Sequence, residues 1–554
     1  MLDYPFDLGR YRRPVTTSSE AAQIWFDRGL NWVFGYNHEE AGVCFQNALE
    51  ADPGCAMASW GRAYVIGPNY NRPWEAFTPE QLRKMLAKSR AAIRTAKATM
   101  GSASEVEQAL ILALEHRYPS DEPAPDLSIW STAYAQAMRE VYARFPEDPD
   151  VATLFAESMM NRTPWQMWDL RSGQPEPGSD TLECREVLED GLQKVAARGA
   201  QRHPGLLHLY IHLMEMSPVP EVALRHADEL RELVPAAGHL AHMATHIDVL
   251  CGHYQDVVTW NHKGILADEA YWRHAGAMNF YSLYRVHNYH FKLYGAMFLG
   301  QFRPAMEAVE GMMKTIPDAL VRCEDPPMAD WLEGYLSIKT HALIRFGRWQ
   351  ALIDDPLPEH SVDYAMTTAL NWYGKGIAYA ALQQPDKADE ARRAFEAAAA
   401  RVPDSRYIHV VPCTQILAVA REMLNGEVEY HRGKYDVAFA RLRQAVVLED
   451  ALPYDEPWPW MMPSRHPLGA LLMEQGHHVE AAAIYEADLG LNDTCIRANR
   501  HPSNVWALKG LHACYLALGQ TREAAMIKPQ LDVALSRADP GVYASCFCSG
   551  RSSG

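Results

Sequence analysis

The chain has 554 residues, more than one ordinary hydrophobic core supports, so several domains or a repeat solenoid are expected. Its net charge of −17 argues against general affinity for nucleic acid or anionic membranes, and no apolar run reaches the roughly 18 residues that a membrane span requires. The start of the chain lacks the basic and apolar stretches of a signal peptide, and its 10 cysteines are mostly isolated, so we expect a cytoplasmic protein with reduced thiols.

Residues 1–20 are predicted to be irregular, with a helix cap at residues 17–20. Beyond them, small and aromatic residues fall on the spacing of a tetratricopeptide repeat. This repeat is a helical hairpin of about 34 residues in which small side chains let two helices approach closely. Agreement at seven positions in one window makes the signal specific. The agreeing positions are Trp25, Gly29, Trp32, Ala41, Phe45, Ala48 and Pro53.

Similar frames recur as far as about residue 535, separated by Pro- and Gly-rich connections, and no strand-like alternation appears. We therefore predict an all-α, tetratricopeptide-repeat-like helical solenoid over residues 21–540, with histidine-rich repeats at 203–295. It is expected to be one curved body and not two independent domains. A tail, residues 541–554, carries a Cys-x-Cys sequence.

Of the 23 histidines, 12 lie between residues 203 and 290. Many of them fall in three predicted helices, each the first helix of a successive repeat hairpin. In this fold the second, fifth and ninth positions of first helices line the concave groove, and neighbouring helices lie roughly 8–10 Å apart. Imidazoles from adjacent helices can therefore reach a shared metal ion. The seven candidate ligands are His208, His212, His239, His242, His246, His287 and His290.

A single histidine in a repeat is most often a satisfied polar residue, and a groove histidine can also contact a peptide. Seven histidines at groove-lining positions of neighbouring repeats favour a transition-metal site, since burying imidazoles without a ligand costs free energy. The number of imidazoles and the scarcity of carboxylates favour copper over zinc and iron. Glu215 shares the face of His208 and His212 and is the candidate general base. Cys546 and Cys548 either hold Cu(I) or belong to an exposed tail without a role, and the second interpretation is preferred.

Several stretches resemble a family of large bacterial and fungal tetratricopeptide-repeat proteins, distantly similar to the animal tetratricopeptide repeat protein thirty-eight. The resemblance covers nearly the whole chain and implies the repeat fold, but no particular reaction. The stretches are residues 34–41, 56–61, 67–71, 156–160, 203–205, 208–212, 239–246, 287–288 and 546–548.

Together these observations predict a metal-dependent enzyme, a copper or other transition-metal oxidoreductase acting on a small molecule in the groove. Trp60, Tyr70 and Trp458 are expected to form apolar walls there, and Arg465 to pair with a substrate carboxylate. Two alternatives stay open: a scaffold that binds a protein or peptide without catalysis, and a zinc-dependent hydrolase. Nucleic acid and membrane are not expected as partners. Phosphate-binding loops, nucleophile elbows and dinucleotide fingerprints are missing from the sequence.

Overall fold

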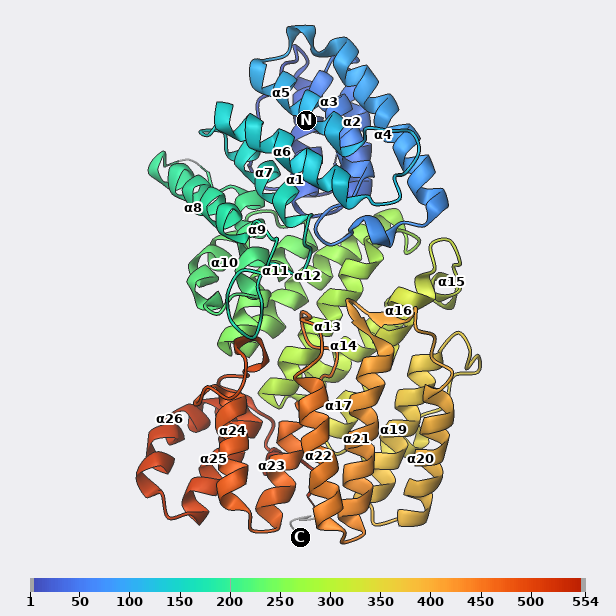
Figure 1. Ribbon diagram of the computed structural model, residues 1–554, viewed down its shortest axis with the longest axis vertical. Coiled ribbons are helices and arrows are strands. Elements are labelled where there is room, and N and C mark those ends of the chain that lie inside the picture. Colours follow the sequence, from blue (N-terminus) through green and yellow to red (C-terminus); the bar gives the residue numbers. More distant parts are fainter. Residues whose placement is uncertain (1–3, 200, 550–554) are drawn as a thin grey trace. The chain divides into compact units, whose positions relative to one another are not determined.

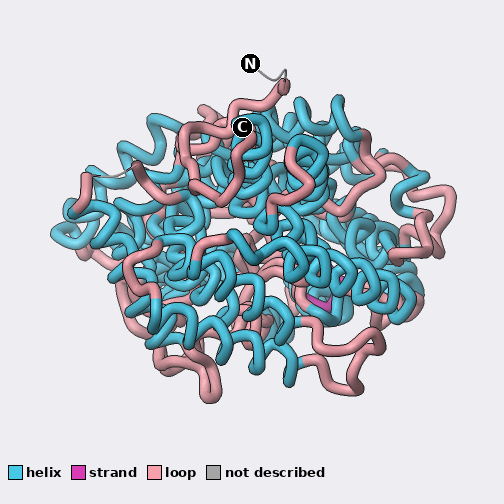
Figure 2. Tube along the Cα trace, turned by 90° about the horizontal axis from the view of Figure 1, so that it is seen from above, coloured by secondary structure: helices cyan, strands magenta, loops and turns pink. Residues whose placement is uncertain are grey.

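Helices joined by loops make up nearly all of the computed structural model, which describes residues 4–199 and 201–549 (Figures 1 and 2). The described ranges contain one sheet. It is the antiparallel pair β1 (Tyr407–Ile408) and β2 (Val411–Pro412), drawn in magenta in Figure 2. The all-α prediction is therefore confirmed.

The chain divides into two compact units. Unit 1 consists of Met1–Ile247 and Lys263–Arg285, and unit 2 of Asp248–His262 and Val286–Gly554. The prediction that one continuous solenoid runs through residues 21–540 stays a prediction.

Unit 1 contains the helices of the first half of the chain, together with short 3₁₀ turns. The α-helices are α1 (Glu20–Phe34), α2 (His38–Ala51), α3 (Ala56–Ile66), α4 (Pro79–Thr99), α5 (Glu105–Leu114), α6 (Ser128–Arg144), α7 (Pro149–Met160), α8 (Thr181–Ala197), α9 (Pro204–Glu215) and α10 (Leu224–Leu230). The 3₁₀ turns are η1 (Trp74–Ala76), η2 (Met100–Ser102), η3 (Glu115–Arg117) and η4 (Pro220–Ala223).

Three helices have residues in both units: α11 (Gly238–Cys251), α12 (Tyr254–Ala275) and α13 (Ser282–Leu299). The remaining helices belong to unit 2. They are α14 (Phe302–Thr315), α15 (Asp318–Val321), α16 (Met328–Leu336), α17 (Lys339–Arg345), α18 (Trp349–Asp354), α19 (Ala365–Ala381), α20 (Pro385–Ala399), α21 (Cys413–His431), α22 (Tyr435–Glu449), α23 (Arg465–Glu474), α24 (His478–Leu489), η5 (Arg497–Asn499), α25 (Val505–Ala517) and α26 (Thr521–Arg537).

The first hairpin of unit 1 follows the predicted repeat frame. Helix α1 begins after Ser19, whose side chain accepts a hydrogen bond from the Ala22 amide and so satisfies one of the free N–H groups of the first turn. The Phe45 ring of α2 lies between Gly29 of α1 and Gly61 of α3, and a methyl group at either glycine would approach that ring to 2.7 Å. Only glycine allows these helices to pack so closely.

Unit 2 repeats this arrangement near the end of the chain. The Tyr485 ring of α24 lies between Gly469 of α23 and Gly510 of α25, and a methyl group at either glycine would overlap the ring. In both units an aromatic side chain of a second helix is thus held between glycines of two first helices. This packing makes the architecture tetratricopeptide-repeat-like.

Candidate functional site

Five of the seven predicted histidine ligands come together in unit 1, on α9 and α11. They are His208, His212, His239, His242 and His246, and each is at most 1% exposed. We call them the histidine cluster. Two pairs of ring nitrogens face each other: Nε2 of His208 and His239 are 3.1 Å apart, and Nε2 of His242 and His246 are 2.7 Å apart. The histidine-bearing faces of α9 and α11 therefore pack against each other, as the helical spacing of the histidines led us to expect.

The start of α9 explains how this helix comes so near to α1. His203 caps α9 by accepting a hydrogen bond from the Leu206 amide, and Pro204 occupies the first position, where no intrahelical N–H donor is needed. Gly205 then faces the Phe34 ring, and a methyl group there would approach it to 2.6 Å. This close approach puts the end of α1 within hydrogen-bonding distance of the next turn of α9.

Hydrogen bonds to acceptors outside the cluster, the Phe34 carbonyl and the Glu215 carboxylate, fix the orientation of three of its imidazoles. His208 Nδ1 donates to the Phe34 carbonyl oxygen at 2.7 Å, because a carbonyl can only accept. Glu215 accepts from Nδ1 of His212 at 2.8 Å and from Nδ1 of His246 at 2.5 Å, one bond to each carboxylate oxygen. In the neutral form of such a ring, a proton on Nδ1 leaves the lone pair on Nε2.

Burial favours the neutral form of His239. It holds the pKa of His239 well below the usual histidine range, and the neighbouring imidazoles of the cluster lower that pKa further. A neutral imidazole is the form that binds a metal ion. At neutral pH His239 therefore presents a nitrogen lone pair and not a positive charge.

Tyrosines surround the cluster, and the sequence interpretation missed the most central one. The Tyr36 ring centroid lies 4.5 Å from that of His208, 5.5 Å from His239 and 6.2 Å from His212. Tyr36 has a φ of 55°, a left-handed conformation that is uncommon for a residue with a bulky side chain. Its position between Gly35 and the helix-capping Asn37 indicates a tight turn, and it lies in the stretch 34–41 that carries the family resemblance.

Two predicted ligands belong to unit 2. The His287 ring centroid lies 5.4 Å from that of His409, whose Nδ1 is 2.5 Å from Asp455. His290 Nε2 lies 2.8 Å from the Met461 sulfur, and burial lowers the His290 pKa to about 3. Neither His409 nor Asp455 was among the predicted site residues, because they come from loops that the repeat frame does not cover.

The predicted substrate walls need correction. Trp60 is 2% exposed and stacks on Tyr64 within unit 1, so it is a core residue and not a groove wall. Tyr70 is fully buried; it packs against the His212 ring, and its hydroxyl accepts a hydrogen bond from the Trp165 amide.

In unit 2, the Trp458 Nε1 donates to the Ala498 carbonyl at 3.2 Å. The Arg465 guanidinium donates two hydrogen bonds to Asp450, at 2.7 and 2.6 Å. Its charge is therefore already neutralised within the fold, which corrects its expected role as the partner of a substrate carboxylate.

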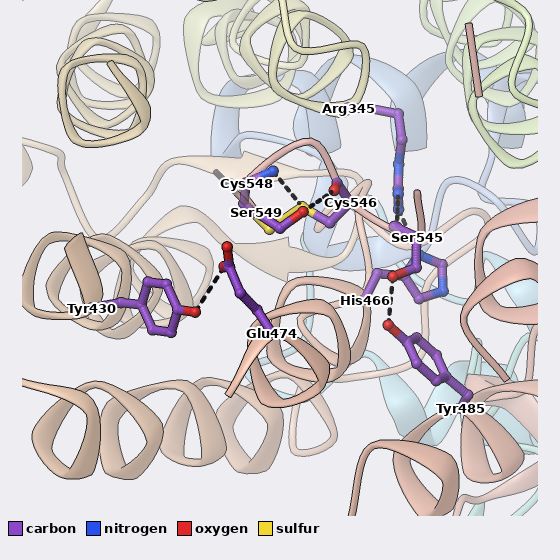
Figure 3. The surroundings of a disulfide bond; sticks show 9 residues. All are labelled: Arg345, Tyr430, His466, Glu474, Tyr485, Ser545, Cys546, Cys548 and Ser549. Carbon is purple, nitrogen blue, oxygen red and sulfur yellow. Dashed lines mark hydrogen bonds between the residues drawn. A yellow bond between two sulfur atoms is a disulfide. The ribbon is translucent and has the colours of Figure 1, made fainter. Parts of the chain in front are cut away.

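The end of unit 2 departs from the prediction of an exposed tail with reduced thiols. Cys546 and Cys548 form a disulfide and are 2% and 1% exposed (Figure 3). Arg345 of α17 donates to the Ser545 carbonyl at 3.4 Å, and the Ser545 hydroxyl shares a 2.5 Å hydrogen bond with the Tyr485 hydroxyl. Residues 541–549, which we call the C-terminal segment, are thus held against the helices.

The C-terminal segment lies in what we call the tail groove, the surface of α17, α23, α24 and α25 that it covers. The Phe547 ring lies 5.9 Å from that of Trp506 on α25 and 5.0 Å from that of Tyr543. A cavity of about 380 Å³ remains between the segment and the helices. Its lining includes Ala470, Met473, Glu474, Lys509, Gly510, Ala513 and Ala517.

Comparisons with known proteins give a distant likeness in fold. No protein-family model and no curated protein matches the chain. Among solved structures, a human IFIT1 dimer with m7Gppp-AAAA is 9% identical, with a TM-score of 0.31 over 94% of this chain and 92% of that one. Naa15/Naa10 bound to HypK-THB is 12% identical, with a TM-score of 0.21 over 93% and 70%. The APC/C hetero-tetramer Cut9-Hcn1 is 13% identical, with a TM-score of 0.22 over 94% and 96%.

The prediction of a copper oxidoreductase is wrong. Within the molecule, the expected substrate wall Trp60 is a core residue, and the charge of Arg465 is neutralised by Asp450. Glu215, the expected general base, instead holds two imidazoles in place. The expectation that nucleic acid is not a partner stays a prediction. Among residues 4–199 and 201–549, no helix is both long enough and apolar enough to cross a membrane.

Proposed function

We propose that this protein is a binding scaffold whose tail groove receives a peptide segment of another protein. The observation that supports this proposal is the C-terminal segment itself, an irregular stretch of chain that already occupies the groove through side-chain and main-chain contacts. Repeat proteins of this architecture commonly bind partner segments along their first helices.

The contacts of the C-terminal segment define the chemistry of the partner. Arg345 donates to a main-chain carbonyl, a group that every peptide offers, so this contact gives affinity without selecting a sequence. The Tyr485 hydroxyl pairs with a serine hydroxyl, and Trp506 contacts an aromatic ring two residues later. We therefore expect a partner segment with a small hydroxyl residue followed by an aromatic residue.

The cavity beside the segment sets the size of the side chains that fit. Ala470, Gly510, Ala513 and Ala517 contribute almost no volume, so about 380 Å³ stays open beside the occupied part of the groove. A partner that binds more tightly than the chain's own segment would fill this volume with apolar groups, and each buried methylene would contribute about 0.8 kcal/mol.

A labelled peptide with the sequence of residues 541–549, closed by its disulfide, tests the proposal on the full-length chain. The chain's own segment competes with the peptide, so the double variant Tyr543→Ala/Phe547→Ala should bind it at least about tenfold more tightly than the unmodified chain. Adding Ala513→Phe should abolish this binding, because the new ring fills the cavity. Fluorescence anisotropy measures both effects.

The matched control adds the same ring elsewhere. Met526 of α26 is 73% exposed, so Met526→Phe in the double-variant background should leave peptide binding unchanged. If the folded double variant shows no saturable binding, or if Ala513→Phe and Met526→Phe behave alike, the groove only anchors the chain's own end and the scaffold proposal fails.

We also propose that the chain belongs to the family of large bacterial and fungal tetratricopeptide-repeat proteins that it resembles. Support comes from residues 208–212 and 239–246, which were part of the resemblance and which form the buried histidine cluster of unit 1. A search for chains that share this histidine pattern, followed by metal and peptide assays on one of them, would test the assignment.

A further inference from the structure

We propose that His208, His212 and His239 form a binding site for one transition-metal ion of the imidazole-preferring class, Zn²⁺ or Cu²⁺, inside unit 1. One ring nitrogen from each residue lies within 4.8 Å of the others, and all three side chains are buried. The site would bind its ion whether or not the tail groove of unit 2 receives a partner.

The spacing of the nitrogens suits a shared ion. With metal–nitrogen bonds of about 2.0–2.1 Å, two ligands of a tetrahedral ion have nitrogens about 3.3 Å apart. The Nε2 atoms of His208 and His239 are 3.1 Å apart. The ring centroids of His208 and His212 are 4.8 Å apart, so the third imidazole lies close to this pair. Small side-chain movements would complete a three-nitrogen site.

The hydrogen bonds around the site are those that histidine ligands generally make. A metal-bound imidazole usually donates its other N–H to a carbonyl or carboxylate, which fixes its orientation and increases its basicity. His208 donates to the Phe34 carbonyl, and His212 donates to Glu215. In each ring the Nε2 atom is therefore the one that would bind the ion.

The remaining two histidines of the cluster support the site. His246 also donates to Glu215, and its Nε2 lies 2.7 Å from that of His242. Since His246 Nδ1 carries the proton, His242 donates from Nε2 to His246 in this pair. Glu215 thereby links a ligand of α9 to α11, and both helices are held at the distance that the site requires.

The donor set defines the class of ion. Three imidazole nitrogens suit Zn²⁺ and Cu²⁺, whereas Mg²⁺ and Ca²⁺ need oxygen ligands. Glu215 is engaged by two N–H donors, so it acts as a positioning residue. All three ligands are at most 1% exposed, and the Tyr36 ring centroid lies 4.5, 5.5 and 6.2 Å from those of His208, His239 and His212. We therefore assign the site a structural role and no redox reaction.

Direct titration of the full-length protein tests this assignment. After chelator treatment and desalting, the chain should bind one equivalent of Zn²⁺ or Cu²⁺ with a dissociation constant below about 1 µM and a raised Tm. Mg²⁺ should not compete. The metal content of protein made with both ions present separates the two: bound zinc identifies a zinc site, and bound copper a copper site. Binding weaker than about 100 µM for both ions would overturn the proposal.

Variants locate the ion. His208→Gln, His212→Gln and His239→Gln should each weaken binding at least about a hundredfold, and Glu215→Gln about 10–100-fold through the loss of an orienting bond. His226→Gln is the matched control, since His226 is a half-buried histidine of α10 in the same unit, outside the cluster. Equal loss in the control, or full binding in the three ligand variants, would contradict the assignment.

X-ray absorption of the metal-loaded wild-type chain provides the test if a ligand variant fails to fold. It should show imidazole scattering from about three nitrogen ligands and no sulfur at the short distance of a thiolate. A sulfur ligand, or a spectrum without imidazole, would place the ion elsewhere and overturn the proposal.

Discussion

The two compact units share one packing arrangement but use their first helices differently. In unit 1 Phe45 is held between Gly29 and Gly61, and in unit 2 Tyr485 is held between Gly469 and Gly510. The hairpin backbone is therefore built in the same way at both ends of the chain. What differs is the set of side chains on the other faces of the first helices.

In unit 1, α9 and α11 carry imidazoles that are sealed from solvent and hydrogen-bonded to Glu215 and Phe34. In unit 2, α23 and α25 carry alanine and glycine at Ala470, Gly510 and Ala513, which leaves room for the C-terminal segment and a cavity. Large polar side chains thus close the space between first helices, while small ones open it to a peptide. The repeat frame allows either use.

Among these predictions, lowering the pH should cause the largest loss of stability, and both units should be destabilised. Burial lowers the pKa of His38 in unit 1, and of His290 and His341 in unit 2, to about 3. In the unfolded chain these histidines titrate near their usual pKa of about 6.5. Between these values the unfolded state binds more protons, so stability falls as pH decreases, by about 1.4 kcal/mol per pH unit for each histidine.

Urea unfolding between about pH 7.5 and about pH 5 measures this effect, and hydrogen exchange of peptides from each unit assigns it. The stability should be flat above pH 7 and decrease below about pH 6.5 in both units. If only one unit responds, the buried histidines of the other are protonated in the folded state, and the comparison between the units must be revised.

Removal of the aromatic rings held between glycines should have the next largest effect on stability. Phe45→Ala and Tyr485→Ala each leave a cavity beside two glycines that cannot fill it, and each should lower the free energy of unfolding by about 3–5 kcal/mol. Similar losses would show that the two hairpin sets are equivalent. Val43→Ala is the control: Val43 is 51% exposed, so its replacement should change stability by less than about 0.5 kcal/mol. Chemical denaturation gives both values.

Glu215→Gln should destabilise unit 1 and leave unit 2 unchanged. An amide oxygen can accept from one imidazole, while the amide NH₂ then faces the N–H of the other, so a buried charge-assisted bond is lost at a cost of about 1.5–3 kcal/mol. Hydrogen exchange in α9 and α11 should accelerate, whereas exchange in α23 and α25 should stay the same. The exposed Glu186 on α8 provides the control Glu186→Gln. Equal changes in both units would contradict the local role of Glu215.

Phe547→Ala should have the smallest effect, confined to unit 2. The substitution removes ring contacts with Trp506 and Tyr543, which are worth about 0.5–1.5 kcal/mol per aromatic pair. Protease cleavage within residues 541–549 should become faster, and the stability of α9 and α11 should not change. Val533→Ala, at a 59% exposed position of α26, is the control. Unchanged cleavage would mean that other contacts hold the segment.

The repeat fold could be predicted from sequence because its determinants are local. Gly29 and Phe45 lie within one hairpin, and their spacing is visible without any tertiary information. The shared faces of His208 and His212, and of His239, His242 and His246, follow in the same way from helical periodicity. The structure brings these five together as expected, although an ion bound to them is still a proposal.

The rest depended on contacts between distant residues. His208 is oriented by Phe34, 174 residues earlier, and no periodicity links them. Tyr36 points at the cluster because its backbone is left-handed, which sequence patterns do not indicate for tyrosine. Arg465 is neutralised by Asp450 of the preceding connection, so a free charge was wrongly expected. The C-terminal segment lacks a repeat pattern, and its burial comes from the groove that receives it.

The single carboxylate of Glu215 has a consequence for how this chain can change over generations. Its two oxygens serve His212 and His246 at the same time. Loss of either imidazole leaves the same buried acid short of a donor, so the cost of losing one depends on whether the other is present. The three positions are therefore coupled. Intermediates that lack one member keep a buried polar group without its partner, and descendants should keep all three residues or replace them together.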